Sequence, residues 1–127
     1  MIYMVEHTFS APELEDDWHR WYAGNLRVLL GVPGIESAQR FRVPGTKPPR
    51  YMAMYTVAGP EVFESEAYRS AGGGGANSVR FRPAYQVWLR NVFDGIDVAP
   101  DVPADASLVT VDAERAFSRS KCVGERD

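Results

Sequence analysis

The chain has 127 residues, 45% of them hydrophobic and 24% charged, which predicts one globular domain with a packed core and leaves no room for a second. The formal net charge is −3 and the 14 lysines and arginines are scattered, which argues against a nucleic-acid-binding protein. The apolar runs are too short to span a bilayer and the start lacks the pattern of a signal peptide, so we expect a cytoplasmic protein with no membrane partner.

The first two predicted elements are a strand and a long helix. Residues 2–9 (IYMVEHTF) are rich in β-branched and aromatic side chains, as strands are. Ser10 can then cap a helix, with Glu13 reaching back to the cap. Apolar side chains recur at spacings of three and four over about 11–31, which predicts one amphipathic helix that ends at VPG (32–34).

The remaining elements complete a familiar order. Residues 35–43 and 50–58 alternate as strands do and are joined by a polar turn, which predicts a hairpin. A short helix should run from Pro60 to about Ser70, and residues 84–93 read as a last strand. The order βαββαβ predicts an α+β, ferredoxin-like fold, in which a four-stranded antiparallel sheet carries both helices on one face.

The strand at 50–58 is apolar on both of its faces. Two helices can cover only one face of a sheet, and a second apolar face calls for another layer. We therefore expect a homodimer that buries the other face through a two-fold axis. The two sets of side chains are Tyr51, Ala53, Tyr55 and Val57 on one face and Met52, Met54 and Thr56 on the other.

Four segments resemble the dimeric α/β-barrel proteins, particularly the EthD-like small barrels. They are WHRWYAGNLRVLLGVPGIESAQRFR, PRYMAMYTV, EAYRSAGGG and VWLRNVF, and the similarity spans residues 1–95. The resemblance implies a ferredoxin-like dimer in a superfamily of cofactor-free monooxygenases, polyketide cyclases, lactone isomerases and haem-using enzymes. Many relatives carry a histidine in the long helix where this chain has Asn25. Asparagine cannot serve as a general base near neutral pH, although it can still hydrogen-bond a carbonyl.

Three polar residues are candidates for chemistry. His7 has a pKa suited to proton transfer and is the proposed acid/base, unless it is a core residue. Asn25 lies on the apolar stripe of the helix and contacts either a substrate or a structural partner. Arg40 either holds a carboxylate or enolate, or is a solvated edge charge or an intersubunit ion pair. His19 is expected to be solvated.

Five aromatic side chains could line a pocket between the long helix and the sheet, in which a small ligand would bind. As plain core residues they would look the same in the sequence. They are Trp21, Tyr22, Tyr51, Tyr55 and Trp88.

The four glycines at 72–75 do not form a phosphate loop, because such a loop precedes a helix and this one follows one. They are predicted to be a mobile connection. The alternative is a lid over the pocket that brings Arg80 or Arg82 close when it shuts.

Residues 1–95 thus form the predicted domain, and 96–127 are expected to comprise a linker, an added strand at 107–112 on a sheet edge and a flexible tail. The lone Cys122 cannot form an internal disulfide, and no His/Cys cluster has the spacing of a zinc site. We expect neither a metal nor a cofactor.

These observations favour a cofactor-independent enzyme that acts on a small apolar carbonyl or aromatic compound, by isomerisation, cyclisation or oxygenation. His7 would be its acid/base, and Asn25, Arg40 or a tyrosine would stabilise developing negative charge. The alternative is a non-catalytic small-molecule-binding or accessory protein with the same barrel.

Overall fold

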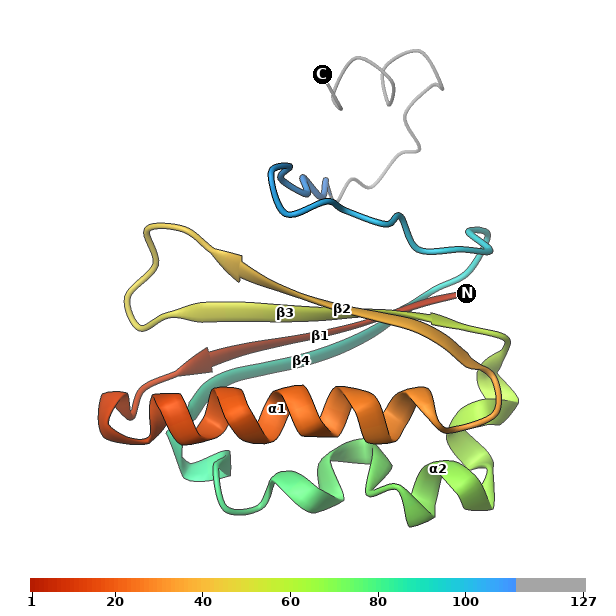
Figure 1. The fold of residues 1–127 in the computed structure, drawn as a ribbon, viewed down its shortest axis with the longest axis horizontal. Coiled ribbons are helices and arrows are strands. Elements are labelled where there is room, and N and C mark those ends of the chain that lie inside the picture. The colour runs from red at the N-terminus through yellow and green to blue at the C-terminus, as the bar shows by residue number, and fades with distance from the viewer. Residues whose placement is uncertain (112–127) are drawn as a thin grey trace.

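The chain folds into one four-stranded antiparallel sheet with two helices packed on the same face (Figure 1). The computed structural model describes residues 1–111. The strand order β2-β3-β1-β4 puts β4 at one edge and the β2–β3 hairpin at the other. The α+β, ferredoxin-like arrangement predicted from the sequence is confirmed. Its elements are β1 (Ile2–Phe9), α1 (Glu15–Leu30), β2 (Ile35–Val43), β3 (Arg50–Val57), α2 (Glu66–Ser70) and β4 (Tyr85–Phe93).

The start of α1 differs from the sequence prediction. The Ser10 hydroxyl does not cap the helix but donates to the carbonyl oxygen of Ala84 at 2.9 Å, on the segment that leads into β4. A single 3-10 turn, Pro12–Leu14, comes first, and the α-helix begins at Glu15. Three acidic residues occupy its first turn, where they favour the positive end of the helix dipole.

The second helical segment is broken in two. A 3-10 helix, Pro60–Glu64, is followed by an extended residue, Ser65, before α2 begins. The Ser65 hydroxyl accepts a hydrogen bond from the backbone N–H of Tyr68 and caps α2. No helix in the described part of the chain is long and apolar enough to cross a membrane.

The main core lies between the helices and the sheet face that they cover, which we call the inner face. Trp18 of α1 is wholly buried and stacks on Phe9 of β1, with ring centroids 4.2 Å apart. Alternate residues of each strand point to this face, and they include Tyr3, Val5, His7 and Phe9 of β1 and Tyr51, Ala53, Tyr55 and Val57 of β3.

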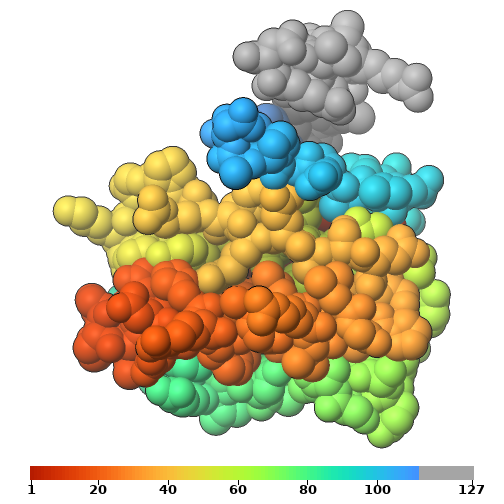
Figure 2. Space-filling model, in the orientation of Figure 1, coloured from red at the N-terminus to blue at the C-terminus, as the bar shows by residue number. Residues whose placement is uncertain are grey.

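The opposite sheet face, the outer face, is partly covered by residues 94–111 of the same chain (Figures 1 and 2). The backbone N–H of Ala99 donates to the Thr56 hydroxyl at 2.8 Å. The Gln39 side chain donates to the Val102 carbonyl at 2.6 Å and accepts from its N–H at 3.1 Å. This cover shields a small apolar cluster that includes Met52 and Met54.

The added strand predicted at 107–112 is not formed over residues 107–111. Instead of pairing along a sheet edge, the segment lies over the outer face, where Leu108 packs against the cluster that contains Met52 and Met54. Asp112, the tail predicted at 113–127 and Cys122 lie outside the described residues.

Candidate functional site

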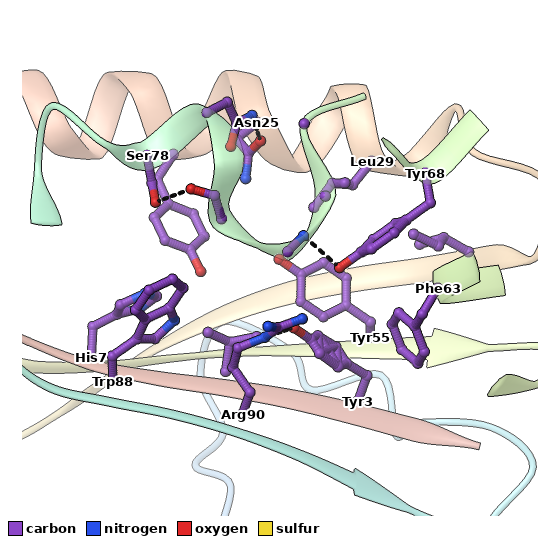
Figure 3. A pocket seen from close by; sticks show the side chains of 18 of the residues that line it. Tyr3, His7, Asn25, Leu29, Tyr55, Phe63, Tyr68, Ser78, Trp88 and Arg90 are labelled. Carbon is purple, nitrogen blue, oxygen red and sulfur yellow. Dashed lines mark hydrogen bonds between the residues drawn. The ribbon is translucent and has the colours of Figure 1, made fainter. Parts of the chain in front are cut away.

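A cavity, which we call the inner pocket, opens between α1, the inner face and residues 72–78 (Figure 3). The cavity has a volume of about 50 Å³. Ligand pockets commonly have volumes of about 300–1,000 Å³. The inner pocket is therefore narrow, and a ring-containing ligand needs one wall to shift.

The structure brings most of the sequence-predicted site residues to this pocket. From α1 come Trp21, Tyr22 and Asn25, and from the sheet come His7, Tyr55 and Trp88. The other two predicted residues, Arg40 and Tyr51, do not line it.

His7 lies in the second half of β1, where it pairs with Tyr51 on one side and Trp88 on the other. It is 5% exposed, and its ring centroid is 4.4 Å from that of Tyr85. No hydrogen bond to its ring is found among residues 1–111. Burial, followed by the positive charge of Arg40, lowers the pKa of His7 to about 4. The imidazole is therefore neutral at neutral pH.

Arg40 lies behind the pocket, partly buried against aromatic rings. Its guanidinium carbon is 4.1 Å from the ring centroid of Tyr22 and 4.6 Å from that of Trp18. Its Nη1 is 2.8 Å from Nδ1 of His19, whereas Nε and Nη2 have no hydrogen-bond partner in the described part of the chain. Arg40 is thus not a solvated edge charge, and it places an unneutralised positive charge near His7.

Two further expectations are corrected around the first turn of α1. His19 is not fully solvated, because it contacts Arg40 and its Nε2 lies 3.6 Å from Oε1 of Glu15. Burial lowers the pKa of His19. The Tyr51 hydroxyl donates to the same Glu15 oxygen at 2.5 Å. The first turn of α1 therefore holds Tyr51 away from the pocket.

Residues 72–78 form the roof of the pocket, and we call them the roof segment. The side-chain amide of Asn77 donates to Oδ1 of Asn25 at 2.7 Å, and the Gly74 N–H donates to the Tyr68 hydroxyl at 2.9 Å. Arg82 donates to the Gly75 carbonyl oxygen. The glycine loop thus covers the pocket, as the lid alternative requires, and Arg82 is already in contact with it.

Glycine is required in the roof segment for two reasons. Gly72, Gly74 and Gly75 have φ values of 78°, 75° and 81°, a region that other residues rarely adopt. In addition, a Cβ on Gly75 would lie 2.5 Å from Cη2 of Trp88. The roof therefore approaches the pocket aromatics more closely than any side chain would allow.

The sequence reasoning missed several lining residues, of which Arg90 has the most chemical consequence. Its Nε donates to the Tyr3 hydroxyl at 2.8 Å. Arg90 is two residues from Trp88 on β4, so alternation places both on the inner face. That signal was present in the sequence, but the position of β4 beside β1 was needed to use it. Tyr3, Tyr68, Ser78 and Tyr85 also line the pocket.

No metal site accompanies the pocket in the part of the chain that the structure describes. No group of three or more His, Cys, Asp or Glu side chains within residues 1–111 is arranged to hold a metal ion. None of the lining residues is Asp or Glu. The chemistry available there comes from one imidazole, one guanidinium, amides, hydroxyls and indole N–H groups.

Three solved structures with the same fold come from proteins that are described in different ways. A mutant of SnoaB, a cofactor-independent oxygenase from Streptomyces nogalater, has a TM-score of 0.58 and 13% identity over 79% of this chain and 96% of its own. An EthD family protein from Bacillus halodurans C-125 has a TM-score of 0.53 and 9% identity over 73% and 98%. A mutant of MhuD with two manganese protoporphyrin IX molecules per active site has a TM-score of 0.53 and 15% identity over 79% and 100%.

No family model and no curated protein matches the sequence. At identities of 9–15% the structural likeness shows the fold alone. The resemblance predicted from the sequence is confirmed at that level: the chain has the ferredoxin-like fold that SnoaB, the EthD family protein and MhuD share.

Proposed function

We propose that the protein binds a small, mainly apolar carbonyl or aromatic compound in the inner pocket and catalyses cofactor-independent proton transfer on it, with His7 as the base. One observation carries this proposal. His7 is the single histidine that lines the pocket, and its neutral ring has no hydrogen-bond partner among the described residues. Aromatic side chains surround it, as they do in many small-ligand sites.

The proton transfer follows from the charges around His7. A neutral imidazole nitrogen takes a proton from the carbon beside a ligand carbonyl, and the electron pair of the broken C–H bond moves to give an enolate. Arg40 disfavours the imidazolium that forms, but the same positive charge stabilises the enolate. In a ligand whose enolate is conjugated with a carbon–carbon double bond, returning the proton to the far carbon of that double bond completes an isomerisation with no oxidant or reductant.

Two N–H donors support the proposal by offering bonds to an enolate oxygen. Trp88 Nε1 is buried and has no hydrogen-bond partner in residues 1–111. The Asn25 side chain lines the pocket and uses its oxygen to accept from Asn77, which leaves its own N–H groups for a ligand. An unpaired buried donor costs about 1–3 kcal/mol, so a ligand oxygen that satisfies it gains affinity.

Hydrogen exchange of a ketone in D₂O tests this function. With 2-indanone as the probe, we expect the native protein to accelerate exchange of the protons beside the carbonyl, as followed by NMR. His7→Phe should abolish the acceleration, whereas His19→Gln, which changes the histidine outside the pocket, should retain it. Equal exchange with and without native protein contradicts catalysis by His7.

A second function is favoured by the low pKa of His7, about 4, which makes the imidazole a weak base. In this alternative the protein binds the same compounds without turnover, as a binding or accessory protein. Saturable binding of 2-indanone together with unaccelerated exchange supports it.

We also propose that two copies of the chain associate through the outer face. Residues 94–111 cover only part of this face, and apolar side chains remain exposed on it and on the covering segment. Such a surface suits a self-complementary two-fold contact. The exposed apolar residues are Leu89, Phe93, Ile96, Val98, Val109 and Val111.

A further inference from the structure

Positive charge surrounds the inner pocket although the whole chain is acidic. The formal net charge is −3, yet no Asp or Glu is among the lining residues and one arginine, Arg90, is. Arg82 supports the roof, with its guanidinium carbon 5.2 Å from the ring centroid of Trp88. With Arg40 behind His7, three guanidinium groups are gathered around an apolar cavity. This distribution favours a ligand that carries negative charge.

Arg90 is the one of the three that reaches the pocket itself. Its guanidinium projects into the space between Trp88 and Tyr3 (Figure 3). Nε is used by the Tyr3 hydroxyl at 2.8 Å, which holds the side chain on the inner face. Arg90 makes no ion pair with an Asp or Glu of residues 1–111. Arg90 is exposed at the pocket, and the Tyr68 hydroxyl lies close to its guanidinium. A ligand carboxylate that displaces Tyr68 and water from the terminal nitrogens can form two parallel hydrogen bonds with them.

The spacing of residues along β4 gives the distance between Arg90 and His7. His7 pairs with Trp88, and Arg90 is two residues further along the same strand. Each residue of an antiparallel strand advances about 3.4 Å, so His7 and Arg90 are offset by about 7 Å along the strands, besides the spacing of about 5 Å between β1 and β4. That separation is close to the width of one six-membered ring with its substituents.

We propose that Arg90 selects ligands that carry a carboxylate, placed about one ring away from the atom that faces His7. The inference rests on the proposed function and deepens it, because it names the substrate class of the same pocket as small cyclic carboxylic acids. Arg90 is then a specificity-determining residue, and the aromatic walls hold the ring.

A matched pair of probes tests the role of Arg90. Binding of 2-naphthoate and of its uncharged analogue 2-naphthamide is measured by isothermal titration calorimetry at pH 7. A charged hydrogen-bonded pair is worth enough to give the native protein a preference for the acid of about tenfold or more. Arg90→Gln should lower the affinity for the acid by about tenfold more than the affinity for the amide, which removes the preference, and Arg90→Lys should keep part of it. Arg27→Gln, at an exposed position near the end of α1, is the control and should bind as the native protein does.

The two proposals fail in different ways. Equal binding of acid and amide by the native protein, or a preference that survives in Arg90→Gln, overturns the role of Arg90 and leaves the pocket in place. Binding of neither compound contradicts the binding pocket and, with it, this inference. Loss of the preference in Arg90→Gln, with amide binding retained, supports it.

Discussion

Asn77 and Asn25 join the roof of the inner pocket to its helical wall through a 2.7 Å hydrogen bond between their side chains. Asn25 lines the pocket from α1. The sequence left open whether Asn25 contacts a substrate or makes a structural bond. The structure shows the bond, which links the glycine-rich roof segment to α1.

Removal of this bond should loosen the roof without unfolding the protein. We expect Asn77→Ala to lower the free energy of unfolding by less than about 1 kcal/mol, because the bond is exposed to water. Amide hydrogen exchange in residues 72–78 should nevertheless become faster, since the segment loses its link to α1. Mass spectrometry of the exchanged peptides measures this. The control is Ser70→Ala, which removes an exposed side-chain bond within α2. Unchanged exchange in the roof would show that the asparagine pair has no such role.

Alanine substitutions at Gly74 and Gly75 distinguish the cost of backbone strain from the cost of a steric clash with Trp88. Gly74 and Gly75 both have positive φ, at 75° and 81°, so alanine at either costs about 1–2 kcal/mol. Nothing lies within 4 Å of a Cβ on Gly74, whereas a Cβ on Gly75 would meet Trp88. We therefore expect Gly75→Ala to be the more destabilising by about 1–3 kcal/mol, measured by urea denaturation. Equal losses would mean that the roof is not packed on Trp88.

The low pKa of His7 predicts how stability depends on pH. In the unfolded chain a histidine titrates near pH 6.5, and in the folded protein His7 titrates near 4. Above pH 6.5 both states are neutral at this residue. As the pH falls from 6.5 to about 4, the unfolded state binds a proton that the folded state does not, and stability declines by about 3 kcal/mol.

Thermal or urea unfolding between pH 4 and pH 8 measures this decline. His7→Phe should flatten it, and His19→Gln should change it much less, because His19 is only partly buried. A native protein whose stability depends on pH no more than that of His7→Phe would show that folding does not lower the pKa of His7.

Strand alternation in the sequence predicted the four strands and which residues share a face, because a period of two is a local property. It grouped Tyr51, Ala53, Tyr55 and Val57 on one face of the strand at 50–58, and these residues do lie together on the inner face. Alternation could not predict the contacts between segments that are far apart in the sequence. Ser10 looks like a helix cap until the Ala84 carbonyl lies beside it, and Arg90 becomes a pocket residue only when β4 pairs with β1. Residues 107–111 have the composition of a strand but lie over the outer face.

The proposed dimer predicts the effect of a charge on the outer face. Leu89 is 45% exposed on β4 and should become buried on association. We expect Leu89→Asp to shift the native dimer to a monomer, because an unpaired buried carboxylate is strongly unfavourable. Val28→Asp, at a 53% exposed position on α1, should leave the dimer intact. Sedimentation velocity measures both variants, and a native chain that sediments as a monomer contradicts the proposed interface.

Locating the binding site of a small ring compound is the most direct test of the inner pocket as the ligand site. NMR spectra of the tryptophan indole N–H and methionine methyl groups are recorded while 2-naphthoate and 2-indanone are added, with the Trp88 signal assigned from Trp88→Phe. Trp88 lines the inner pocket, and Met52 and Met54 lie on the outer face. We expect saturable shifts of the Trp88 indole signal while both methionine signals stay in place. Saturable shifts confined to the methionines, or no saturable shift of Trp88, would contradict the assignment of the inner pocket as the ligand site.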